Sequence, residues 1–178
     1  MRFGSRSMAV VAGLLLLGAS VASAQHPQTR KGFWIGFGLG YGSYGCTGCG
    51  STGSISGYLK MGGTISKHFL LGGETNGWTK GESGTTLTTG NASFAAYYYP
   101  QPAGGFFLRG GVGFSEARAS QGGLSASSSG PGATAGLGYD LRVGGNTSIT
   151  PVANFVWGHP DSGINQHILQ FAIGVTFH

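Results

Sequence analysis

Hydrophobic residues alternate with small or polar residues along most of this chain, with the period of two that is typical of β-strands. In residues 33–41 every odd position is large and apolar, whereas the even positions after Trp34 are glycines. The pattern recurs in eight segments, each with one apolar face and one face of mostly Gly, small or polar residues. The other seven apolar faces lie within residues 57–65, 69–75, 92–98, 106–114, 133–143, 149–157 and 169–177. The sequence therefore predicts an all-β fold.

The few charged residues avoid the apolar faces. Only 8% of residues are charged, while 40% are hydrophobic. Five charges fall inside the predicted strands, all on the face opposite the apolar one: Lys60, Glu74, Arg109, Asp140 and Arg142. We expect the others in turns, loops or the N-terminal tail. The cations are scattered singly, which argues against a nucleic-acid site, since such a site needs a clustered basic patch.

Two barrel orientations fit this pattern: a soluble barrel with the apolar face inside, and a membrane barrel with that face in lipid. Glycine makes up 37 of the 178 residues. An eight-stranded barrel has little interior room, so long polar side chains inside it require small neighbours. Aromatic residues also gather near the predicted strand ends, where membrane-interface girdles belong. We therefore expect an eight-stranded antiparallel up-and-down transmembrane β-barrel.

The connections between strands predict which ends of the barrel face which side. Short turns are expected at 66–68, 100–104 and 144–146, and longer loops at 43–54, 79–83, 116–130 and 158–166. This asymmetry is typical of outer-membrane barrels, which have short periplasmic turns and long extracellular loops. Odd turn lengths keep the apolar faces together across a hairpin. They place Lys60 opposite Glu74, Val143 opposite Thr147, and Tyr98 opposite Phe106.

Residues 1–24 have the layout of a cleavable signal peptide. Arg2 and Arg6 precede the apolar run 8–17, and Ala22-Ser23-Ala24 supplies a small-residue cleavage site. The alternative, a membrane anchor, would need ~20 apolar residues. Position 25 is Gln rather than Cys, so no lipid anchor is expected. We predict a single barrel domain over residues 25–178.

Two stretches, Gly136–Asp140 and Phe171–His178, together with the eight segments and their connections, resemble the small OmpA/OmpX-like outer-membrane β-barrel family. The resemblance implies a place in the cell outer membrane, with outer-membrane lipid and the barrel-assembly machinery as partners. It also implies that the last strand is an assembly signal. The outward residues of that signal are Phe171, Ile173, Val175 and Phe177. Phe177 is penultimate, and we expect His178 to be a frayed terminus. A monomer without a cofactor is expected.

Inside the barrel, we expect the five strand charges to form a paired polar network. A buried unpaired charge costs several kcal/mol, whereas a pair supported by hydrogen bonds can persist. Lys60 is expected to pair with Glu74, and Arg109 to lie near Asp140 and Arg142. Such pairs would block ion flow. The alternative is a water-filled lumen in which each charge is solvated.

Cys46 and Cys49 have three interpretations: a redox pair, half of a metal site, or a local disulfide. A thioredoxin-like pair belongs to an α/β fold, and a structural zinc site needs four ligands. The sequence therefore favours a disulfide in the first outer loop.

Three functions from different classes fit such a chain. The favoured one is a non-enzymatic barrel that supports envelope integrity or displays loops for surface contacts. The second is a narrow pore for small solutes. The third is a membrane-embedded hydrolase or acyltransferase that uses His159, His167 and Asp161 with the serines of 125–129, although no G-x-S-x-G motif surrounds those serines. No catalytic, cofactor-binding or metal-binding residue is assigned.

Overall fold

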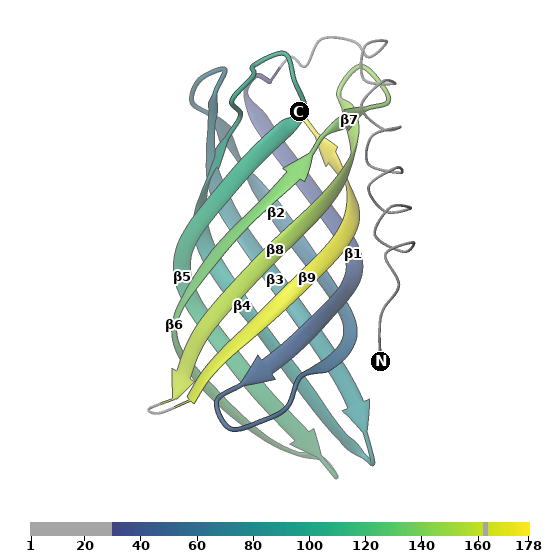
Figure 1. Cartoon of the computed structure of the whole chain (residues 1–178), viewed down its shortest axis with the longest axis vertical. Helices are drawn as coiled ribbons and strands as arrows, with labels where there is room; N and C mark the ends of the chain where they lie inside the picture. The colour runs from purple at the N-terminus through teal and green to yellow at the C-terminus, as the bar shows by residue number, and fades with distance from the viewer. Residues whose placement is uncertain (1–29, 162–163) are drawn as a thin grey trace, which may run out of the picture.

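A computed structural model describes residues 30–161 and 164–178, so the expected signal peptide lies outside the described residues. The chain forms one antiparallel sheet that closes on itself, because β6 and β7 both pair with β8 (Figure 1). Its strands are β1 Phe33–Cys46, β2 Thr52–Thr64, β3 Phe69–Glu82, β4 Thr85–Tyr98, β5 Phe106–Gln121, β6 Leu124–Tyr139, β7 Leu141–Arg142, β8 Thr147–Asp161 and β9 Ile164–Phe177. The two-residue β7 continues β6 beyond Asp140, which makes this the predicted eight-stranded barrel.

Within the described residues, no helix is long and apolar enough to span a membrane.

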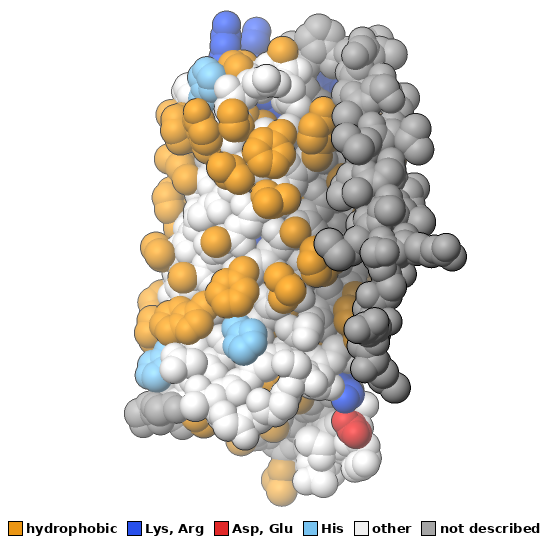
Figure 2. All heavy atoms as spheres, in the orientation of Figure 1, with side chains coloured by type: hydrophobic (Ala, Val, Ile, Leu, Met, Phe, Trp, Pro, Cys, Tyr) orange, Lys and Arg blue, Asp and Glu red, His pale blue; other side chains and the backbone are white. Residues whose placement is uncertain are grey.

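The two faces of the barrel wall follow the predicted alternation. Large apolar side chains such as Leu39, Val112 and Ile173 point outward and are 65–70% exposed. On the face shown in Figure 2, these side chains cover the wall as a band, and the cationic, acidic and histidine side chains lie near its two ends. The residues between them point inward and are mostly buried. The apolar face is therefore the outer face.

The strand registers agree with two of the three predicted turns. Lys60 is the cross-strand partner of Glu74, and the Val143 N–H donates to the Thr147 carbonyl. The third prediction is wrong by two residues, because Tyr98 pairs with Leu108 rather than Phe106. Phe106 instead pairs with Tyr139 of β6. Pro100 and Pro102 have no N–H to donate, so the β4–β5 ladder cannot close as tightly as expected.

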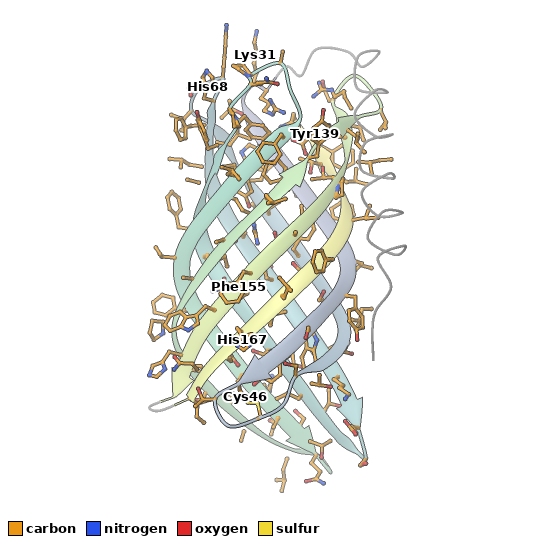
Figure 3. All side chains as sticks on the ribbon, viewed as in Figure 1. Lys31, Cys46, His68, Tyr139, Phe155 and His167 are labelled. Carbon is orange, nitrogen blue, oxygen red and sulfur yellow. A yellow bond between two sulfur atoms is a disulfide. The ribbon has the colours of Figure 1, made fainter. Side chains whose placement is uncertain are left out.

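The barrel has two distinct ends. We call the end with turns 66–68, 99–105 and 143–146 the turn end, and the opposite one, near Cys46, the loop end (Figures 1 and 3). At the loop end, the predicted long loops 79–83 and 116–130 are wrong. Both stretches continue the strands and reverse in two-residue turns, Ser83-Gly84 and Gly122-Gly123, whose residues all have positive φ. Such type I′ turns match the twist of paired strands. Backbone pairing between the strands therefore continues up to these turns, although the apolar alternation of the sequence ends before them.

The outer band predicts a clear asymmetry in the cost of a new charge. Leu108 lies on the outer face of β5, opposite Leu137 of β6. Val112 lies four residues further along the same outer face, nearer the middle of the apolar band, and is 70% exposed. Val112→Arg should lower the free energy of unfolding in lipid vesicles by about 2–4 kcal/mol, the cost of arginine near the bilayer midplane. Leu124→Arg adds the same charge at the tip of β6, where Leu124 is 80% exposed and pairs with uncharged Gln121, and is the matched control. Denaturant titration, read by the mobility shift of folded against boiled protein, measures both. Equal losses would contradict the assignment of the faces.

Candidate functional site

The centre of the barrel interior is organised around the carboxylate of Glu74. Arg109 of β5 forms a buried ion pair with this carboxylate. Tyr97 donates to Glu74 Oε2 at 2.5 Å, and Thr134 donates to Oε1 at 2.6 Å. Asn76 completes the group, since it donates to Glu74 and accepts from Arg109, each at 3.4 Å. We call these five residues the central network. They come from β3, β4, β5 and β6, so they connect half of the barrel wall across its lumen.

Lys60 is buried next to the central network but is surrounded by aromatic rings. Its Nζ lies 4.8 Å from the ring centroid of Phe107, 5.4 Å from that of Tyr97, and 5.9 Å from those of Trp34 and Tyr58. These separations are within the range of cation–π attraction. Lys60 forms no ion pair or hydrogen bond with the described residues. Although Glu74 is its cross-strand partner, the expected Lys60–Glu74 salt bridge is absent from this part of the chain.

A second group of buried residues meets at Asp140, at the turn end. Arg30, which precedes β1, lies 3.7 Å from Asp140, and His178, which follows β9, lies 3.3 Å from it. Tyr99 and Thr150 each donate to this carboxylate at 2.8 Å. We call these five residues the terminal clasp, because they connect the segments that flank the first and last strands. The expectation of a frayed His178 is wrong: its side chain is 1% exposed.

Arg30 is held by more than Asp140. Its guanidinium lies 3.5 Å above the Tyr99 ring centroid and donates to the carbonyls of Pro102 and Gly104 at 3.1 and 2.8 Å. The sequence suggested only a tail residue here. Arg142 lies at the same end and donates to the carbonyls of Gly144 and Gly145.

The structure therefore places all five predicted lumen charges inside the barrel, but some of their partners differ from those predicted. Lys60, Glu74, Arg109, Asp140 and Arg142 are each at most 7% exposed. Arg109 contacts Glu74 rather than lying beside Asp140, and Asp140 contacts Arg30 and His178. Barrel strands are tilted and staggered, so equal distance from the turn end does not give equal height on neighbouring strands.

Aromatic and aliphatic side chains fill much of the remaining lumen, which was expected to be mainly polar and glycine-lined. Towards the turn end, the buried cluster consists of Trp34, Tyr58, Leu70, Ala95, Tyr97, Tyr99, Phe107, Val152 and Ala172. Towards the loop end, Tyr44 stacks on Trp78 with 5.0 Å between the ring centroids, and Val156 and Ile168 pack with them. Except for Tyr99, which follows β4, each lies at an inward position of its strand, so strand parity was the signal that could have found them.

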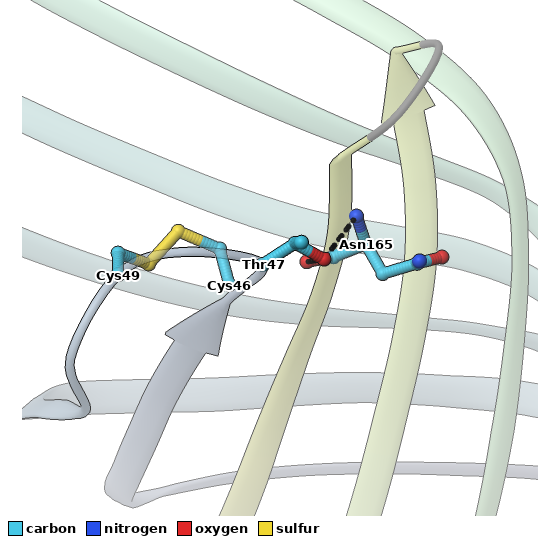
Figure 4. Close-up of a disulfide and its surroundings, with 4 residues drawn as sticks. All are labelled: Cys46, Thr47, Cys49 and Asn165. Atoms are coloured by element: carbon cyan, nitrogen blue, oxygen red, sulfur yellow. Dashed lines mark hydrogen bonds between the residues drawn. A yellow bond between two sulfur atoms is a disulfide. The ribbon is translucent and has the colours of Figure 1, made fainter.

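The two cysteines form a disulfide at the loop end. Cys46 and Cys49 are bonded, with 5.2 Å between their Cα atoms (Figure 4). The intervening Thr47 exchanges hydrogen bonds with Asn165 near the start of β9: its N–H donates to the Asn165 carbonyl at 2.9 Å. The disulfide loop is thereby attached to the neighbouring β8–β9 hairpin.

The histidines considered for catalysis lie on the outer wall near the loop end. The ring centroids of His159 and Trp157 are 6.4 Å apart, and the two rings are stacked. His167 stacks on Phe155 in the same way, with 6.1 Å between the ring centroids (Figure 3). Among the described residues, neither histidine hydrogen-bonds to a serine, and no cluster of three His, Cys, Asp or Glu could hold a metal ion. At the loop end of β3, on a different part of the wall, the Lys80 ammonium lies 2.9 Å from Glu82 and lowers the pKa of that exposed carboxyl.

The predicted assembly residues share the outer face of β9. Phe171, Ile173, Val175 and Phe177 all point outward, and they pair with β1 on one side and β8 on the other. The inward turn of His178 leaves Phe177 as the last outward residue of the strand.

A family model described as "Outer membrane protein beta-barrel domain" matches residues 12–177. No curated protein matches the sequence closely enough to count as a relative.

Solved structures of small outer-membrane barrels share the fold. The attachment invasion locus protein Ail of Yersinia pestis is 14% identical, with a TM-score of 0.62 over 84% of this chain and 100% of Ail. Neisserial surface protein A is 18% identical, with a TM-score of 0.64 over 84% of this chain and 99% of that protein. The N-terminal barrel domain of Pseudomonas aeruginosa OprF is 11% identical, with a TM-score of 0.50 over 84% and 100%. At these identities the likeness establishes the fold alone.

Proposed function

Because the chain belongs to the outer membrane protein β-barrel domain family, we propose that it is a closed, non-enzymatic barrel that presents two rigid hairpins at the cell surface for contacts with other surfaces. Its location is the cell outer membrane. The turn end then faces the periplasm, and the loop end faces the exterior. We call residues 79–88 and 116–129 the surface hairpins.

The observation that carries this proposal is the length of the strands at the loop end. β5 and β6 each have 16 residues, whereas ~9–11 residues of a tilted strand cross a membrane. The excess forms the hairpin 116–129, which is rich in serine and has Leu124 80% exposed at its tip. A paired hairpin has fewer conformations to lose on binding than a flexible loop, so it is suited to contact.

The closed state is supported by the contents of the lumen. The central network, the terminal clasp and the two buried hydrophobic clusters together occupy the barrel interior, and Tyr97 and Tyr99 each belong to both a cluster and a polar group. A barrel of eight strands has an interior just wide enough to be filled by side chains. The alternative of a narrow solute pore would be favoured by a large steady conductance of the wild-type protein in planar bilayers.

A non-enzymatic role is supported by the surroundings of the residues considered for catalysis. His159 and His167 stack on aromatic rings of the wall, and Ser128 donates to the Pro160 carbonyl at 2.6 Å. We further propose that the outward side of β9 is the surface read by the barrel-assembly machinery and that the protein is a monomer in lipid.

The hairpin 116–129 offers a direct test of the contact role. Arg118 and Ser127 are cross-strand partners, so replacing residues 119–126 with Asn-Gly shortens the hairpin and provides a type I′ turn. Cells that express this variant should be retained on immobilised proteins and glycans less well than cells with the wild-type barrel, because only the hairpin 79–88 then keeps its full length. Their outer membrane should remain as impermeable to a hydrophobic dye as with the wild type.

The matched control replaces Gly122-Gly123 with Asn-Gly, which changes the turn sequence but keeps the hairpin length. It should be retained like the wild type. Unchanged retention of the shortened variant, together with increased dye entry, would show that the barrel supports envelope integrity and not surface contact.

A further inference from the structure

The outer wall over β2–β5 contains three grooves that meet at Thr75. One, of about 460 Å³, lies over Gly77 and Gly90; a second, of about 510 Å³, lies over Gly73 and Ala92; a third, of about 330 Å³, lies over Gly57. Thr75 lines all three. We call the combined depression the wall groove. It lies in the loop-end half of the apolar band, at the level of the outer leaflet.

The wall groove coincides with a gap in the aromatic girdle. Tyr41 and Phe114 provide outward aromatic rings on β1 and β5. Between them, β2, β3 and β4 carry outward glycines, Gly57, Gly77 and Gly90, which are cross-strand partners in one row. The gap is therefore a recess lined by Phe114 on one flank and by Leu39 and Ile55 on the other.

Packing accounts for some of the recess glycines but not for all of them. An added Cβ at Gly90 would lie 2.7 Å from the Asn76 carbonyl oxygen, so glycine is required there. An added Cβ at inward Gly62 or Gly72 would overlap the backbone of the partner strand, so close packing accounts for those residues. At Gly73 and Gly77 an added Cβ would meet no atom within 4 Å, and neither residue has a positive φ. Glycine weakens a strand and gives lipid no apolar side chain to cover. The effect of these two residues is to leave space on the wall.

The wall groove is apolar towards the middle of the membrane and polar towards the loop end. A membrane lipid has the same order, with apolar acyl chains below a polar headgroup. The inner part of the wall groove is walled by Leu59, Phe94 and Val112. One row beyond the Gly57, Gly77 and Gly90 row, Thr79 and Thr88 face each other with 3.1 Å between their hydroxyl oxygens, and Arg118 is the next partner in that row. Glu116 also lines the rim, where it can accept hydrogen bonds from sugar hydroxyls. The rim thus combines a cation suited to phosphate with hydroxyls and an acceptor suited to sugars.

We propose that the wall groove binds a phosphorylated, acylated glycolipid of the outer leaflet, with acyl chains along Gly73 and Gly77 and the phosphate near Arg118. The acyl part of the site lies on the outer wall, whereas its rim includes Thr79, Thr88, Glu116 and Arg118 at the base of the surface hairpins. The proposal does not rest on the contact role of those hairpins, because lipid binding by the solubilised barrel is measured without any cell-surface contact.

The test fills the wall groove without disturbing the barrel. Gly77→Leu places a side chain in open space within the recess. Gly63→Leu is the matched control, because Gly63 is also an outward glycine with no atom within 4 Å of an added Cβ but does not line the wall groove. Gly73→Leu is a second filling variant, which serves if Gly77→Leu fails to fold. Native mass spectrometry of the detergent-solubilised barrels would measure binding of Kdo2-lipid A, with phosphatidylethanolamine as the comparison lipid.

We expect Gly77→Leu and Gly73→Leu to weaken Kdo2-lipid A binding roughly tenfold, and Gly63→Leu to leave it unchanged. Arg118→Gln should weaken binding of Kdo2-lipid A more than binding of its dephosphorylated form. Equal binding by all glycine variants would overturn the proposal. Equal affinity of the wild type for phosphatidylethanolamine would overturn the glycolipid assignment, and a wild-type dimer dispersed by Gly77→Leu would show that the occupant is a second copy of the chain.

Discussion

Glu74→Gln should lower the free energy of unfolding of the barrel in detergent by about 3–5 kcal/mol, the usual cost of removing one partner of a buried ion pair. The substitution keeps the size of the side chain but removes the charge that faces Arg109. It also removes one of the two oxygens that accept from Tyr97 and Thr134. Arg109 is 7% exposed, so water cannot easily replace the lost carboxylate.

A double-mutant cycle separates the ion pair from the rest of the central network. Arg109→Met removes the cation and keeps an apolar side chain of similar length. If the pair dominates, the double variant should be more stable than the sum of the two single losses predicts, because neither charge is then left buried alone. Additive losses would contradict this and would indicate that the hydrogen bonds from Tyr97 and Thr134 carry the effect.

The same variant tests whether the lumen is closed. In planar bilayers the wild-type protein should show no steady conductance, and Glu74→Gln should add brief openings as the central network loosens. Glu116→Gln alters an acidic residue on the outer face of the same barrel and is the control, with conductance like that of the wild type. A large steady conductance of the wild-type protein, unchanged in Glu74→Gln, would contradict a closed lumen and would favour the alternative function of a narrow solute pore.

The sequence predicts the wall of this barrel well, because a single rule governs it. A strand between lipid and a narrow lumen must alternate, and an odd turn must keep the faces together. The pairing of Lys60 with Glu74 follows from these two conditions. The rule stops where the strands leave the membrane. Residues 116–129 face water on the outer side, so they lose apolar alternation and resemble a loop, although their backbone ladder continues.

Contacts across the lumen depend on quantities that the sequence pattern does not contain. Glu74 and Arg109 lie on strands separated by β4, and their contact depends on the stagger of the strands around the closed barrel. Arg30 and His178 lie outside the alternating segments, so no periodicity indicates that their side chains turn inward. The aromatic rings around Lys60 do follow strand parity, and inward Trp34 and Phe107 could have been recognised as lumen residues from it.

Asp140→Asn is expected to loosen the turn end of the barrel with a loss of about 3–5 kcal/mol in the free energy of unfolding. Asp140 stands at the interruption between β6 and β7, where its N–H donates to the Gly105 carbonyl. Its carboxylate is fully buried and faces both Arg30 and His178. Asparagine has nearly the same shape but no charge, so Arg30 loses its counter-charge and His178 loses its carboxylate partner in a region that water does not reach.

The loosening should be local in origin, and hydrogen exchange can locate it. Amides at the start of β1 and the end of β9 should exchange faster in Asp140→Asn than in the wild type, while amides of the surface hairpins should not change, because the terminal clasp joins only the segments around the turn end. Arg30→Met and His178→Ala each remove one partner and leave the other facing the carboxylate, so each should have a smaller effect on exchange than Asp140→Asn. If Asp140→Asn leaves exchange at β1 and β9 unchanged, or if the loss is spread evenly over the whole barrel, the terminal clasp does not hold the two ends together.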